Sequence, residues 1–151
     1  MKHYLKEIRR IMLASVRMDG AYYFFSKRMG IKENILNLLY ALDDGKPHSQ
    51  QQICQDWLIP KTTVNTNVKE LAAAGYLSLV PGRDRRRKDL ILTEKGMAYT
   101  AEILKDIYAA EQTAIEKTIE KYSPEFVEAL DYFSDCICRE LQTQKISDKK
   151  E

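Results

Sequence analysis

The segment spanning residues 49–92 constrains the fold most, because it joins two short helices directly to a pair of strands. Ser49 is a suitable N-cap for the first helix. After a tight turn at residues 58–59, Pro60 stands in the first turn of the second helix, and Gly75 closes that helix. Two short helices joined by a turn of a few residues form a helix-turn-helix.

The second helix of this pair has two contrasting faces. Its apolar stripe consists of Val64, Val68, Leu71 and Ala72. At about 100° per residue, the opposite direction holds Thr62, Thr66 and Lys69, with Thr63 and Asn65 on its flanks. An asparagine can pair with adenine through two hydrogen bonds, and a threonine can touch a thymine methyl. The alternative is a solvated helix face, which normally carries residues of higher helix propensity than these.

A β-hairpin with a basic tip follows. Residues 76–80 alternate in hydrophobicity, Pro81 and Gly82 start a turn, and residues 90–92 return as a second strand. The charged residues of the tip are Arg83, Asp84, Arg85, Arg86, Arg87 and Lys88. These five cations and one anion repel one another unless a negative surface lies against them. A helix-turn-helix followed by such a hairpin is a winged helix.

The charge distribution also favours a polyanionic partner. Residues 59–88 carry 7 basic and 2 acidic side chains, whereas residues 89–151 carry 8 and 14. A concentrated basic segment beside an acidic one is the footprint of a local nucleic-acid-binding surface. The alternative is a solvated, arginine-rich loop.

Amphipathic helices flank the winged helix and exceed what its core needs. We expect helices over residues 4–28, 31–42, 93–121 and from 124 onward. A homodimer that packs the terminal helices across a two-fold axis would cover their apolar stripes, and the alternative is an intramolecular bundle. The predicted fold is mainly α with a small β-hairpin. Its predicted parts are a winged helix-turn-helix at 30–100, a helical dimerisation region at 1–29 and 101–146, and a disordered tail at 147–151.

Two motifs resemble the MarR-type transcriptional regulators. The wing motif is Asp84-Arg85-Arg86 followed by Leu90-Ile91-Leu92-Thr93-Glu94-Lys95-Gly96. The helix motif is Thr62-Thr63-Val64 with Leu71-Ala72-Ala73-Ala74-Gly75-Tyr76-Leu77. Thr66 departs from the pattern, since many members carry arginine there, so base preference cannot be copied. Glutamines 50–52 and Cys54 stand where an acidic residue and an alanine are frequent, a difference we interpret as neutral for function.

The resemblance implies a DNA-binding regulator, most often a repressor, that binds a pseudo-palindromic double-stranded site as a homodimer. It implies that Arg86 reaches the minor groove and that the Asp84 carboxylate holds one arginine, which fixes the shape of the wing. It also implies a small, often phenolic, anionic effector, for which no residues can be named. The aromatic residues 22–25 could line its cavity or belong to the core. The alternative function is a protein-protein interaction module without specific DNA binding.

Other classes of protein are disfavoured. The only histidines are His3 and His48, and the motifs of hydrolases, phosphate-binding loops and dinucleotide folds are absent, so we expect no enzyme, no metal and no cofactor. Cys54, Cys136 and Cys138 lack a C-x-x-C spacing and are interpreted as free thiols or small apolar residues. No run of about 18 apolar residues could cross a membrane, and the charged N-terminus lacks signal-peptide features. We therefore expect a cytoplasmic protein.

Overall fold

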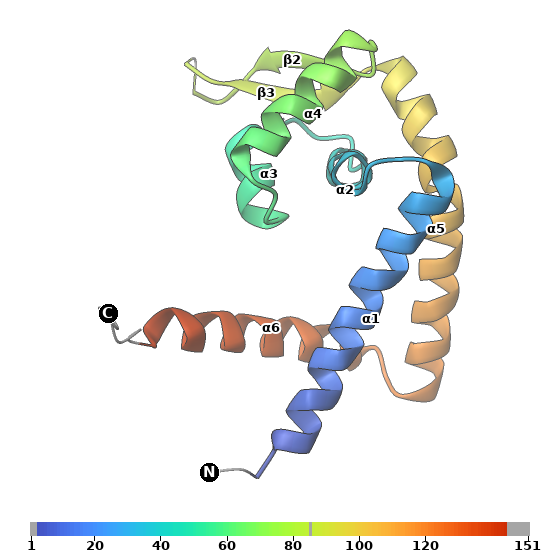
Figure 1. The fold of residues 1–151 in the computed structure, drawn as a ribbon, viewed down its shortest axis with the longest axis vertical. Helices are drawn as coiled ribbons and strands as arrows, with labels where there is room; N and C mark the ends of the chain where they lie inside the picture. The colour runs from blue at the N-terminus through green and yellow to red at the C-terminus, as the bar shows by residue number, and fades with distance from the viewer. Residues whose placement is uncertain (1–2, 85, 145–151) are drawn as a thin grey trace. The chain divides into compact units, whose positions relative to one another are not determined.

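A computed structural model of the chain describes residues 3–84 and 86–144. The chain divides into two compact units, residues 1–104 and 105–151, and α5 runs from the first into the second. The elements are α1 (Leu5–Met29), α2 (Glu33–Leu42), β1 (His48–Ser49), α3 (Gln50–Asp56), α4 (Lys61–Ala73), β2 (Leu77–Pro81), β3 (Lys88–Leu92), α5 (Glu94–Lys121) and α6 (Glu125–Thr143) (Figure 1). The predicted fold class, mainly α with a small β-hairpin in a winged helix, is confirmed.

Most helix ends follow local signals in the sequence. Gly30 adopts a left-handed conformation with φ 70° and closes α1. The Ser49 hydroxyl accepts a hydrogen bond from the Gln52 N–H and caps α3. At α6 the prediction is wrong by one residue, because Pro124 is the N-cap rather than the first helical residue. The Ser123 hydroxyl there accepts a hydrogen bond from the Glu125 N–H at 3.1 Å.

The three strands form one antiparallel sheet in the order β1-β3-β2. The β2–β3 hairpin was predicted, but Pro81 lies in β2 opposite Lys88 rather than in the turn. Proline is tolerated there because β2 is an edge strand. Strand β1 was not predicted; its two residues pair with β3 in the register His48↔Leu90 and Ser49↔Asp89. The small sheet thus anchors the hairpin beside the start of α3.

One hydrophobic core holds α2, α3, α4 and the sheet together. Its buried members are Ile35, Leu38, Leu39, Leu42, Ile53, Ile59, Val64, Val68, Leu71, Leu77, Leu90 and Leu92. The stripe predicted for α4 faces this core, with Ala72 partly buried against it. Burial of each large aliphatic side chain stabilises the fold by about 1.5–3 kcal/mol. The core therefore fixes the orientation of α4 relative to the hairpin.

The apolar faces of the terminal helices are largely open to solvent. In α1 the only buried residue is Ser26, and α6 has no buried residue. The exposed apolar side chains of the two helices include Leu5, Ile8, Ile11, Met12, Leu13, Val16, Phe126, Val127, Leu130 and Leu141. None of the helices in the described part of the chain has the length and apolar character needed to cross a bilayer.

Candidate nucleic-acid interface

The outward face of α4 consists of short polar side chains. Thr62, Asn65, Thr66 and Lys69 are exposed, and Thr63 is half-buried. The Thr66 hydroxyl donates a hydrogen bond to the Thr62 carbonyl at 3.0 Å. Its lone pairs and methyl group remain available to a ligand, because only its single hydrogen is used. These five residues are available on the surface, and their contact with bases stays a prediction.

The turn before α4 is conformationally strained. Leu58 has φ 50°, in the left-handed region that favours glycine or asparagine, and its side chain is 87% exposed. The ring of its neighbour Trp57 packs against that of Tyr40 of α2, with the centroids 5.4 Å apart and the planes tilted by 59°. Ile59, next along the chain, is buried in the core. The two neighbours hold the turn in place while Leu58 itself contributes little packing.

The C-terminal end of α4 is tied to the start of α5. Lys95 donates a hydrogen bond to the Ala74 carbonyl at 2.7 Å, where the partial negative charge of the helix end favours a cation. The Thr93 hydroxyl accepts from the Gly96 N–H at 2.9 Å and donates to the Gly75 carbonyl at 2.7 Å. Thr93 therefore caps α5 and also holds the left-handed Gly75 that ends α4.

Two tyrosines pack beneath this junction. The rings of Tyr76 and Tyr99 stack with centroids 4.2 Å apart and planes 6° apart, and the Lys95 ammonium lies 4.8 Å from the Tyr76 centroid. Burial raises the pKa of Tyr99, with a smaller contribution from Tyr76. The Tyr99 phenol is therefore neutral at physiological pH, and the stack packs α5 against the residue that precedes β2.

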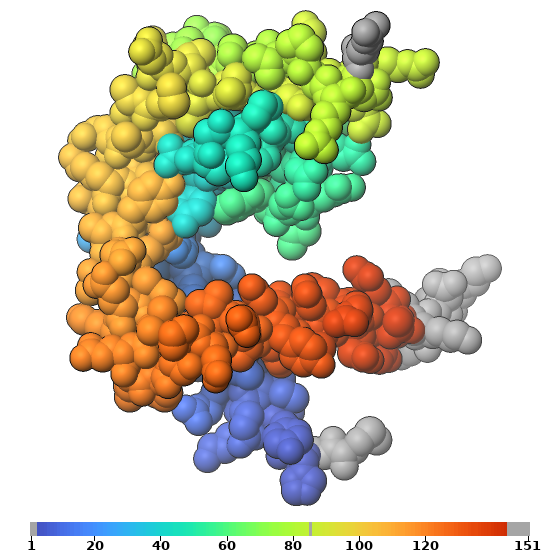
Figure 2. Space-filling view, turned by 180° about the vertical axis from the view of Figure 1, so that it is seen from behind, coloured from blue at the N-terminus to red at the C-terminus, as the bar shows by residue number. Residues whose placement is uncertain are grey.

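The tip of the wing is ordered by hydrogen bonds to Asp84. Its carboxylate accepts one from the Arg86 backbone N–H at 3.1 Å, and its carbonyl accepts one from the Arg87 N–H at 2.9 Å. The carboxylate thus holds Arg86 through the backbone. The Gly82 N–H donates to the Arg87 carbonyl at 3.0 Å, which closes the hairpin. The tip stands out beyond α3 and α4 (Figures 1 and 2).

The cations of the tip differ in their contacts. Arg83, Arg86, Arg87 and Lys88 are exposed, and Arg85 lies outside the described residues. The Arg87 guanidinium donates a hydrogen bond to the Gln51 side-chain carbonyl of α3. This contact of Gln51 with the wing was not predicted, because the two residues lie 36 positions apart and no local pattern in the sequence relates them.

A turn stabilised by charge precedes β1. The Asp44 carboxylate lies 2.8 Å from His48 Nε2 and accepts a hydrogen bond from the Lys46 N–H at 2.9 Å. The hydrogen bond from His48, followed by that from Lys46, lowers the pKa of Asp44. This turn connects α2 to the strand that anchors the wing.

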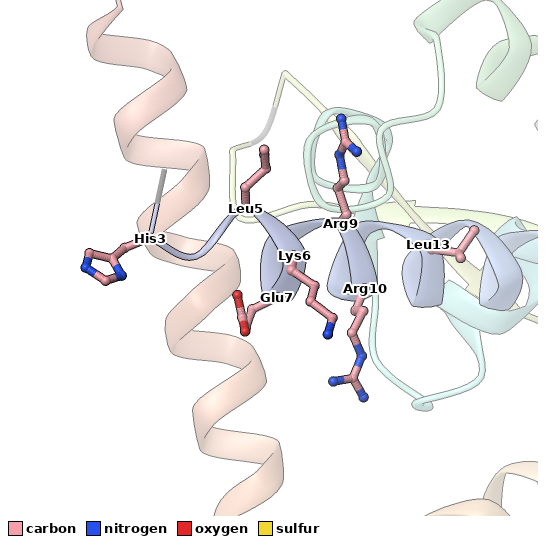
Figure 3. A pocket seen from close by; sticks show the side chains of 7 residues that line it. All are labelled: His3, Leu5, Lys6, Glu7, Arg9, Arg10 and Leu13. Carbon is pink, nitrogen blue, oxygen red and sulfur yellow. The ribbon is translucent and has the colours of Figure 1, made fainter. Parts of the chain in front are cut away.

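Two recesses elsewhere in the first unit are weak candidates for ligand sites. One, of about 610 Å³, lies along the start of α1, where the Arg9 and Arg10 side chains point to opposite sides of the helix (Figure 3). These cations do not converge on a single point, as binding of a small anion requires. The other, of about 270 Å³, is lined by Leu42, Asp43, Gly45, Ile91, Leu92 and Met97.

Metal-binding and disulfide sites are not found in the part of the chain that the structure describes. No three histidine, cysteine or acidic side chains gather there in a way that could hold a metal ion. Cys54 packs partly buried against the core, Cys136 is half-buried and Cys138 is exposed, all as free thiols.

Comparisons with known proteins agree with this architecture. The sequence model of the MarR family matches residues 30–88. A MarR family regulator from Neisseria meningitidis has a similar structure, with a TM-score of 0.68 and 24% identity over 94% of this chain and 95% of that one. The transcriptional regulator BldR from Sulfolobus solfataricus gives a TM-score of 0.63 and 16% identity over 92% of this chain and 99% of its own.

A third similar structure is the transcription regulator MarR from Oenococcus oeni, with a TM-score of 0.65 and 19% identity over 87% of this chain and 97% of that one. No curated protein sequence matches the chain significantly. The resemblance stated from the sequence motifs is thus confirmed, and the chain has the MarR fold.

Proposed function

Because the chain carries the winged helix of the MarR family of transcriptional regulators, we propose that it binds double-stranded DNA at specific sequences and regulates transcription. One observation carries the proposal: a polar, exposed α4 face and a basic wing tip are held by a single core. An α-helix fits the major groove of B-DNA, and a hairpin with arginines fits the neighbouring minor groove. Together, α4 would contact base edges and the wing would contact the DNA backbone and the minor groove.

The exposed residues divide into two roles. Thr62, Thr63, Asn65 and Thr66 are suited to base edges, because they offer hydrogen-bonding groups and methyl groups on short side chains. Lys69 and the wing cations are suited to phosphates, and Arg86 is the proposed minor-groove contact. A narrow, A/T-rich minor groove has an enhanced negative potential, so an inserted guanidinium favours such flanks.

The proposed assembly is a homodimer. The open apolar faces of α1 and α6 support it, because a stable soluble chain needs a partner for contiguous apolar surface. A two-fold dimer presents two α4 helices and therefore binds a pseudo-palindromic site, with half-sites separated by about 34–36 Å.

We propose further that the regulator is a repressor and that a small-molecule effector releases it from DNA. This part rests on the family resemblance, and no effector residues are assigned. A reporter driven by the chain's own promoter tests the sign of regulation, since loss of a repressor raises expression and loss of an activator lowers it.

A gel-shift experiment with the DNA upstream of the chain's own gene tests the proposed function. We expect a discrete complex that excess random DNA does not compete away. Binding that random DNA abolishes would contradict sequence-specific recognition. Absence of DNA binding together with capture of an acidic protein would favour the interaction module instead.

A further inference from the structure

The wing is linked to α3 by a contact that lies beyond the end of the β1–β3 ladder. β1 pairs with β3 at His48↔Leu90 and Ser49↔Asp89. The strand then ends, because Ser49 is also the N-cap of α3 and the chain turns into the helix. The next residues belong to the first turn of α3, and their helical backbone geometry cannot continue a ladder with the wing.

A side-chain hydrogen bond takes the place of the missing ladder. Continuing the β1–β3 register by two residues would set Gln51 opposite Arg87, and these two side chains are hydrogen-bonded. The backbone of Arg87 meanwhile accepts from the Gly82 N–H and donates to the Asp84 carbonyl. A restraint on the Arg87 side chain therefore acts on the same residue that closes the tip.

The chemistry of the link preserves the charge of the wing. The Gln51 acceptor is a neutral amide, so Arg87 keeps its full positive charge while its position is restricted. A carboxylate at position 51 would hold the guanidinium more strongly but would neutralise it toward DNA. Both side chains are exposed, so the link is also accessible to a bound duplex.

We propose that Gln51 is a positioning residue for the wing: it fixes Arg87, and through it the tip, in register with the helix-turn-helix. The inference rests on the proposed DNA-binding function, and it assigns a role to a residue that is not among the proposed DNA contacts. Restricting the tip before binding lowers the conformational entropy lost when the wing enters the groove.

Hydrogen exchange of the DNA-free protein tests the link itself. In Gln51→Ala, the Arg87 and Gly82 amides should exchange faster than in the wild type. Gln52→Ala is the matched control, because the Gln52 amide bonds Asp56 within α3, and it should leave those rates unchanged. Equal exchange of the tip amides in Gln51→Ala and the wild type would overturn the proposal.

Binding to a duplex that the wild type selects from a random pool tests the consequence. Gln51→Ala should weaken binding by about two- to tenfold, the value of one hydrogen bond, with an unchanged salt slope. Gln51→Glu should keep the tip amides protected, yet weaken binding and reduce the salt slope, since a carboxylate neutralises Arg87.

A double substitution separates positioning from direct contact. In an Arg87→Ala background, Gln51→Ala should have no further effect on affinity. An equal loss in both backgrounds would show that Gln51 acts without Arg87 and would overturn the proposal. Failure of the wild type to select any duplex would instead contradict the proposed function. The hydrogen-exchange rates of the DNA-free protein would still show whether Gln51 restrains the wing tip.

Discussion

The Tyr76 carbonyl oxygen lies 1.8 Å from the position that a Cβ on Gly96 would occupy. This close approach lets the first turn of α5 sit directly on the chain between α4 and β2, where the Thr93 N–H also donates to the Tyr76 carbonyl at 3.0 Å. Only glycine fits at position 96. The contact explains physically why a glycine follows the Leu-Thr pair in the wing motif.

Gly96→Ala should therefore destabilise the protein. The added methyl group meets backbone that cannot move aside, so we expect a loss of about 1–3 kcal/mol or more in the free energy of unfolding. Urea denaturation followed by circular dichroism measures it. Gly20→Ala is the control, because nothing lies within 4 Å of its Cβ, and it should stabilise α1 by about 0.5–1 kcal/mol.

The Asp44–His48 contact predicts a specific acid sensitivity. The pKa of Asp44 is lowered in the folded state, so its contribution to stability is present above the unfolded pKa and is lost as the pH falls through the folded one. Asp44→Asn should thus lose stability at neutral pH and show a smaller decrease below about pH 4. Thermal melts at several pH values measure this. If the melting temperature of Asp44→Asn fell at acid pH as much as that of the wild type, Asp44 would not be the source of the acid sensitivity.

The sequence predicted the parts of the fold that depend on local signals. The Ser49 cap, the Gly75 helix end and the apolar stripe of α4 all follow from residues close in the chain. Strand β1 was missed because two residues cannot display an alternating pattern. Burial of Asn67, which is 4% exposed and whose side-chain nitrogen has no partner among the described residues, was also missed, since asparagine in a polar run gives no such signal.

The candidate site was predictable in composition but not in its internal contacts. The exposed face of α4 follows from helical periodicity alone. By contrast, the Gln51–Arg87 link depends on the register of β1 against β3, and the hydrogen bond from the Arg86 backbone to Asp84 depends on the turn geometry. The first is a tertiary feature that residue spacing does not encode, and the second is a local Asx-type turn whose particular donor the composition of the tip does not identify.

The direction in which Asp84→Ala changes DNA affinity distinguishes an ordered wing tip from simple charge attraction. Asp84→Ala removes the hydrogen bond to the Arg86 N–H and raises the net charge by one. If an ordered tip is needed, DNA affinity should fall; pure charge attraction predicts that it should rise. Fluorescence anisotropy at several salt concentrations distinguishes the two, and tighter, salt-sensitive binding would leave only a non-specific basic loop.

The open face of α6 predicts that one added charge disrupts assembly. Leu130, 41% exposed in the chain alone, should lie in the dimer interface, so Leu130→Glu should give monomer or insoluble protein and lose tight DNA binding. Gln142→Glu, which adds the same charge at an exposed polar position of α6, should stay dimeric. A monomeric wild type in sedimentation at micromolar concentration would contradict the proposed homodimer.

Base reading by α4 is the central claim, and the affinity of Asn65→Ala for preferred and random DNA tests it most directly. If Asn65 reads a base edge, the substitution should cost about 1–3 kcal/mol on the duplex that the wild type prefers and little on random duplexes. Lys69→Ala, a proposed phosphate contact, should weaken both alike and reduce the salt slope. Equal losses on the two kinds of DNA for Asn65→Ala would contradict base reading by this residue.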